Sequence, residues 1–141
     1  MTTGNINTDL AVIAAGSATA AAARAAESAQ AAADHQEEVA RIVRERALRG
    51  PTKALREDTQ ECRAALHHEQ VTAAVALADA RRFAADALGH HCQAIDAEER
   101  YRSMSGDAWE QAKYDVERAE MYAASVAGYL DAVMVMTRGI A

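Results

Sequence analysis

Alanine outnumbers every other residue in this chain, and it decides which folds the chain can form. The sequence holds 37 alanines among 141 residues, while leucine, isoleucine, valine and phenylalanine together number 22, about 16%. That share lies below the level of roughly 20% at which globular cores become doubtful. Alanine is the best helix former and loses no side-chain entropy when it is ordered. The sequence therefore predicts helices with thin, closely packed contacts, and it disfavours a β-sheet.

Two breaks divide the chain into three helical segments. Gly50 and Pro51 end the first segment, and Thr52 can cap the second. Residues 103–106 form the second connection, after which Asp107 and Glu110 resemble a capping box. We expect a loose tail over residues 1–6 and one helical domain over residues 7–138, with helices at about 8–49, 52–103 and 107–137.

Short connections between long helices make neighbouring helices antiparallel. The expected fold is therefore all-α, with three long antiparallel helices in an alanine-rich bundle similar to a coiled-coil hairpin. Gly89 interrupts the second segment and leaves another arrangement open, in which a break near this glycine gives four helices. Without a break, the second helix would be roughly 75 Å long.

Small and apolar residues recur every three or four positions, which predicts the buried face of each helix. The predicted row of the first helix is Val12, Ala15, Thr19, Ala22, Ala26, Ala29, Ala33, Ala40, Val43 and Ala47. That of the second is Leu55, Cys62, Leu66, Ala73, Leu77, Ala80, Ala84, Leu88, His91 and Ile95. That of the third is Trp109, Ala112, Val116, Ala119, Ala123, Val126, Leu130, Val133 and Thr137, with the regular spacing of a coiled coil.

The third segment is apolar on more than one face. It carries no charge from Met121 to Leu130, and none again from Ala132 to Thr137. A helix that is apolar nearly all round is normally enclosed, whereas a three-helix monomer covers only one side of it. We expect a homo-oligomer whose interface includes four side chains outside the predicted row: Tyr122, Tyr129, Met134 and Met136. A four-helix monomer bent at Gly89 is the alternative.

Positive charge gathers around the first break. Residues 41–56 contain Glu45 as their single acidic residue, against six basic residues: Arg41, Arg44, Arg46, Arg49, Lys53 and Arg56. A basic hairpin tip on an acidic chain suits an acidic protein or a nucleic acid as partner. The segment has no aromatic residue to stack on bases, and cations at a helix C-terminus also stabilise the helix dipole. A solvated tip without a partner is therefore the simpler alternative.

The histidines and cysteines are poorly placed for a metal or catalytic site. The segment His67–Glu69 lies 23 residues before His90–Cys92, which is roughly 35 Å along a straight helix. No glutamate has a histidine three residues later, as a di-iron bundle requires. Cys62 and Cys92 lie far apart within one helical pattern. We expect no catalytic, cofactor-binding or metal-ligating residue and no cofactor, unless a dimer or a folded-back helix brings the histidine segments together.

These features favour a non-enzymatic structural or interaction protein, such as an assembly, scaffold or adaptor component that acts through its helix faces and basic tip. The alternative is a small regulator that binds nucleic acid or another polyanion through residues 41–56, and a metal-binding bundle is third. Two cysteines and no secretory signal predict a cytoplasmic protein. The uncharged stretch over residues 10–23 is too short for a membrane span, and no small-molecule substrate is evident. The chain has 13 arginines and two lysines, and this preference for arginine favours a bacterial or phage origin.

Overall fold

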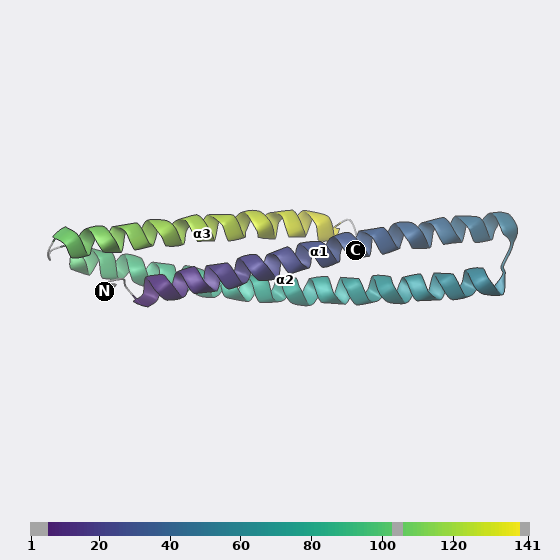
Figure 1. Ribbon diagram of the computed structural model, residues 1–141, viewed down its shortest axis with the longest axis horizontal. Coiled ribbons are helices and arrows are strands. Elements are labelled where there is room, and N and C mark those ends of the chain that lie inside the picture. The colour runs from purple at the N-terminus through teal and green to yellow at the C-terminus, as the bar shows by residue number, and fades with distance from the viewer. Residues whose placement is uncertain (1–5, 103–105, 139–141) are drawn as a thin grey trace.

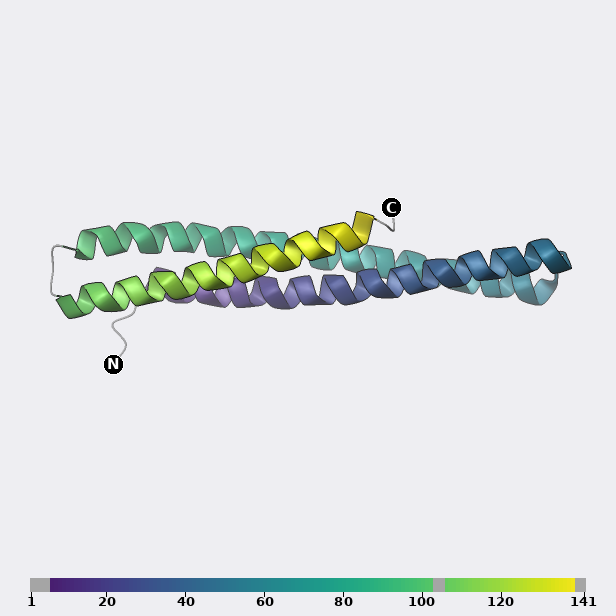
Figure 2. The same ribbon diagram turned by 90° about the horizontal axis from the view of Figure 1, so that it is seen from above.

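The computed structural model describes residues 6–102 and 106–138, which form three helices. They are α1 (Ile6–Arg49), α2 (Lys53–Tyr101) and α3 (Gly106–Arg138). The helices lie side by side in a long rod, with α2 antiparallel to both others (Figures 1 and 2). The predicted all-α bundle of three long helices is confirmed. Residues 1–5 of the predicted tail and Ser103 lie outside the described residues, while Ile6 already belongs to α1.

The turn between α1 and α2 forms where its residues predict it. Gly50 has a φ of 82°, a left-handed conformation that favours glycine, and its N–H donates to the carbonyl oxygen of Arg46 at 2.9 Å. Thr52 is extended, and its hydroxyl accepts a hydrogen bond from the Leu55 N–H at 3.2 Å. Local chemistry therefore fixes this end of both helices.

Helix α2 runs without a break through Gly89. Its 49 residues give a length of about 74 Å. An interior glycine costs roughly 1 kcal/mol relative to alanine. A break here would disturb the helix between Ala87 and the buried His91, Ala94 and Ala97 beyond it. The continuous helix excludes the four-helix alternative.

The buried centre of the rod consists mostly of alanine. Val126 packs with Ala15, Ala18 and Ala87 in one cluster, and Val133 packs with Ala25 and Ala76 in another. Between them lies a cluster made only of Ala21, Ala22 and Ala80, against which Phe83 and Leu130 pack. Small side chains let the helices approach closely, so each contact removes little area from water and many contacts are needed.

The predicted buried row of α1 is partly wrong. The row that is buried contains Ala11, Ala15, Ala18, Ala22, Ala25, Ala29 and Ala32. Of the predicted positions, three are buried, namely Ala15, Ala22 and Ala29. Four are half-buried, namely Val12, Thr19, Ala26 and Ala33, and the last three, Ala40, Val43 and Ala47, are exposed. Because alanines fill both rows, the sequence pattern does not distinguish them.

The prediction for α2 is correct at Ala73, Ala80 and His91, which are buried. It is wrong at Leu88, which is 57% exposed because α3 covers the neighbouring side of α2. In α3, all nine predicted positions are buried or half-buried. The spacing of its larger residues, among them Val116, Val126 and Val133, defined that face in advance.

One helix in the described part of the chain, α1, is long and apolar enough to cross a membrane by length and composition alone. The core helices of soluble proteins pass the same test, so this finding has little weight. In the bundle, the alanine row of α1 packs against α2 and α3.

Candidate functional site

Helices α1 and α2 continue beyond the end of α3 and form a two-helix arm. Val133, near the end of α3, packs level with Ala25 and Ala76. The chain of α3 ends about one turn later, whereas α1 and α2 extend far past that level (Figure 1). We call residues 33–49 and 53–70 the arm. Its free end is the turn at Gly50, so the predicted basic tip projects from the rod.

Four cations surround the turn at the end of the arm. Arg46 and Arg49 lie in the last turn of α1, and Lys53 and Arg56 lie in the first turn of α2. All four are exposed, and none forms an ion pair with another residue in the described ranges 6–102 and 106–138. Leu48, between the two arginines, is 87% exposed. From here on, the name basic tip refers to these four residues alone and no longer to the whole predicted segment 41–56.

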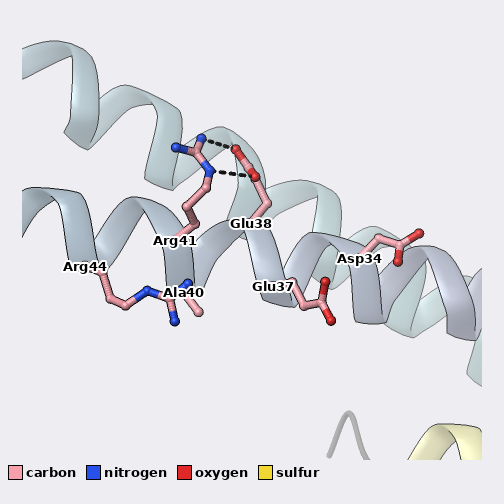
Figure 3. A pocket seen from close by; sticks show the side chains of 6 residues that line it. All are labelled: Asp34, Glu37, Glu38, Ala40, Arg41 and Arg44. Carbon is pink, nitrogen blue, oxygen red and sulfur yellow. Dashed lines mark hydrogen bonds and ion pairs between the residues drawn. The ribbon is translucent and has the colours of Figure 1, made fainter.

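Arg41 is also in the predicted basic segment, but carboxylates on its own helix neutralise it. Its guanidinium donates to both carboxylate oxygens of Glu38, one of them at 3.0 Å (Figure 3). It also donates to Glu45 at 2.6 Å. The hydrogen bond from Arg41 lowers the pKa of Glu38, and its charge acts in the same direction. The two carboxylates raise the pKa of Arg41. Arg41 is therefore less available to a partner than the basic tip.

The facing helix adds negative charge that a count over residues 41–56 does not include. Ala22 shares a cluster with Ala80, and Ala15 shares one with Ala87, so the numbers of facing residues sum to about 102. This register places the exposed residues Glu57, Asp58 and Glu61 at the level of residues 41–45. The excess positive charge is thus confined to the end of the arm.

A hollow of about 480 Å³ lies on the surface of α1 beside Glu38 and Arg41. It is lined by Asp34, Glu37, Glu38, Ala40, Arg41 and Arg44, all from one helix. In Figure 3, Glu38 and Arg41 point toward each other, while Glu37 and Arg44 point away from this pair. A hollow along one helix surface offers no enclosed place for a substrate, although it contains several titratable groups.

The histidine segments stay apart in the continuous α2. His67 and His68 are exposed, whereas His91 is buried, and the Nε2 atom of His91 lies 3.8 Å from Oε1 of Glu120. The Nδ1 atom of His90 lies 3.3 Å from the side-chain oxygen of Gln93. Among the residues the structure describes, no group of three or more histidine, cysteine, aspartate or glutamate side chains is arranged to hold a metal ion.

Two buried polar side chains near the N-terminal end of α3 were not foreseen. Thr8, near the start of α1, is fully buried. Asp115 is 4% exposed, and one of its carboxylate oxygens accepts a hydrogen bond from Gln111 at 3.1 Å. Both residues interrupt the rows of buried alanines. We did not predict them because the core was predicted from the pattern of apolar residues, which omits polar ones.

Helix α3 presents an apolar outer face that neither α1 nor α2 covers. Tyr122 and Tyr129 are exposed, and Met134 and Met136 are half-buried. By helical spacing, these four predicted interface residues lie to either side of the outer face and not at its centre. The sequence-based selection missed Met121 and Val135, which are 71% and 66% exposed at the centre of the face. Their exposure depends on how α3 sits on the bundle, which its sequence alone does not show.

A groove between α2 and α3 forms a second apolar surface. The groove contains a hollow of about 190 Å³, which is lined by Ala84, Ala87, Leu88, Ala123, Val126, Ala127 and Leu130. The groove is lined by apolar residues alone, so it offers packing contacts without acid–base or nucleophilic groups.

Comparisons of the chain with protein-family models, with curated proteins and with solved structures find no match. Function must therefore be argued from the surfaces described above.

Proposed function

We propose that this protein is a non-enzymatic assembly, scaffold or adaptor component that associates with itself through α3. The observation that carries this proposal is the exposed apolar face of α3, from Met121 to Val135, in a chain with few large apolar residues. Contiguous exposed apolar patches mark interaction surfaces in soluble proteins. Tyr122, Tyr129, Met134 and Met136 flank this face and are proposed to contribute to the same interface.

Sedimentation velocity of the untagged protein over about 1 to 200 µM, a range spanning weak specific interfaces, tests the proposal. We expect a reversible rise in mass from the monomer value of 15.0 kDa. The double variant Tyr122→Glu/Tyr129→Glu should remain monomeric, because it places charges beside the apolar face. Tyr101→Glu is the matched control, since Tyr101 is similarly exposed at the end of α2. A wild-type protein that stays monomeric throughout would refute the proposal.

Polyanion binding through the basic tip is a second candidate function. The observation in its favour is that Arg46, Arg49, Lys53 and Arg56 lie in the two helical turns that flank Gly50, at the end of the arm, and that all four are exposed. Four phosphate contacts predict that affinity falls about 100-fold between roughly 50 and 200 mM salt. We propose a cytoplasmic location for either function, because Cys62 and Cys92 lie roughly 45 Å apart on α2 and do not form a disulfide.

Fluorescence anisotropy with labelled duplex DNA and with heparin tests this candidate. The variant Arg46→Ala/Arg49→Ala should lose binding to both ligands. The control Arg24→Ala/Arg81→Ala removes the same charge from exposed positions outside the arm and should bind normally. No binding at about 50 mM salt, or equal losses in both variants, would exclude a role for the tip.

A further inference from the structure

We propose that two copies of the chain pair through antiparallel α3 helices that cross at Gly128. This inference rests on the proposed self-association and adds the partner, the orientation and the register. It concerns the centre of the outer face of α3, opposite the buried row that contains Ala119, Val126 and Val133.

The centre of this face follows helical spacing along α3. Glu117, Met121, Ala124, Gly128 and Val135 recur at three-, four- and seven-residue steps, so they share one side of the helix. All five are exposed in the monomer. Between Glu117 and Arg138, the charged residues Arg118, Glu120 and Asp131 lie at the edges of this side, and none of them lies at its centre. The face is therefore apolar in its middle and charged at its two ends.

The face is complementary to itself when the helix direction is reversed about Gly128. Positions equally far from Gly128 then face each other across the two-fold axis. Met121 lies opposite Val135 of the partner subunit, and Ala124 lies opposite Ala132 of the partner subunit. Large residues thus meet at the ends of the contact and small residues meet near its centre, where the helices cross.

Charge favours the antiparallel orientation. In this register Glu117 lies one residue from the level of Arg138 of the partner subunit, and both residues are exposed in the monomer. A two-fold axis produces this attraction twice. A parallel pair in register would instead place each Glu117 near the same glutamate of the other copy, and like charges repel.

Gly128 has no structural role that the monomer requires. A Cβ atom built on it would meet no atom within 4 Å. Glycine is also less favourable than alanine inside a helix, and alanine is abundant in this chain. A residue without a side chain lets a second backbone approach more closely than alanine does. The crossing at Gly128 gives this glycine such a role.

The contact area fits a reversible dimer. The face from Glu117 to Arg138 has 22 residues and is about 33 Å long, so a contact strip roughly 10 Å wide gives about 330 Å² per copy. The total of about 660 Å² is below the size of stable specific interfaces and belongs to the class of weak, reversible ones. We therefore expect a dissociation constant in the micromolar range or weaker.

Cysteine cross-linking in a Cys62→Ala/Cys92→Ala background tests the register. Facing residues come within disulfide reach, whereas two copies of Cys at position 124 would lie roughly 12 Å apart along the axis. A mixture of the Ala124→Cys and Ala132→Cys variants should therefore cross-link, while each variant alone should not. Cross-linking of each variant with itself would indicate a parallel pair and would overturn the proposal.

Substitution of Gly128 separates this inference from general self-association. Gly128→Leu should retain helicity and weaken the dimer at least tenfold. Gly16→Leu and Gly89→Leu are matched controls, because both glycines are exposed in helix interiors with open space around them. If the wild type dimerises and Gly128→Leu does so equally well, this register is wrong while the proposed function stands. A wild type that never dimerises refutes both.

Reversal of the charges tests the end of the contact. Glu117→Arg or Arg138→Glu alone should weaken the dimer about two- to tenfold, as expected for exposed ion pairs. The double variant should recover most of the lost affinity. Additive losses in the double variant would show that these two residues do not meet.

Discussion

Replacement of Val133 by alanine is the most informative test of how α3 is held on the bundle. Val133 is fully buried and packs against Ala25 and Ala76. It is one of the few large apolar side chains in a core that otherwise consists mostly of alanine, so its replacement should lower the unfolding free energy measurably.

The expected magnitude follows from the groups removed. Two buried carbon groups at about 0.8 kcal/mol each give about 1.6 kcal/mol, and the residual cavity adds to this. The higher helix propensity of alanine offsets roughly 0.5 kcal/mol of this loss. The variant should therefore lose about 1–2 kcal/mol of unfolding free energy, which lowers the Tm by roughly 5 °C.

Urea denaturation followed by circular dichroism, at a protein concentration where the monomer prevails, measures the change. Val75→Ala is the matched control, because Val75 is 58% exposed on α2 and its replacement should be neutral or slightly stabilising. Equal effects of the two substitutions would show that α3 does not pack on α1 and α2 as described.

Three further predictions address other parts of the rod. Ala22→Leu should destabilise the protein by about 1–3 kcal/mol through overpacking, whereas Ala20→Leu, at an exposed position, should change its midpoint in a urea titration very little. Leu88→Ala should cost less than about 1 kcal/mol in the same titration, because the side chain is largely exposed. The lowered pKa of Glu38 stabilises the fold above the unfolded value near 4.5, and this contribution is lost as the pH falls through the lowered pKa. Glu38→Gln should therefore be less stable than wild type at neutral pH and equal to it near pH 2; a difference independent of pH would contradict the Arg41 pairing.

The parts of the fold predicted from sequence are those set by local chemistry or by residues of unequal size. Gly50, Pro51 and Thr52 determine the first turn through backbone conformation and capping, which neighbouring residues alone decide. The buried face of α3 was predictable because Val116, Val126 and Val133 differ in size from the alanines between them. In α1, alanines fill several rows, so the choice between Ala18 and Thr19 depends on the helices that pack against it.

The sequence predicted which basic residues belong to the candidate site, but it did not predict how far the uncompensated positive charge extends along the arm. The charge count over residues 41–56 could not include Glu38, which pairs with Arg41, or Glu61, which lies at the level of Arg41 on the facing helix. Their influence depends on rotamers and on the register of the hairpin. Likewise, the exposure of Met121 and Val135 depends on which side of α3 faces the bundle.

Small-angle X-ray scattering of a dilute, monomeric sample tests the central claim, that alanine-lined helices form an extended rod that acts through its surfaces. A rod about 75 Å long and roughly 20 Å wide has a radius of gyration of about 22 Å. A compact globular chain of this length would have a radius of gyration near 14 Å. We predict a value close to that of the rod, and a value near that of the compact chain would contradict the account.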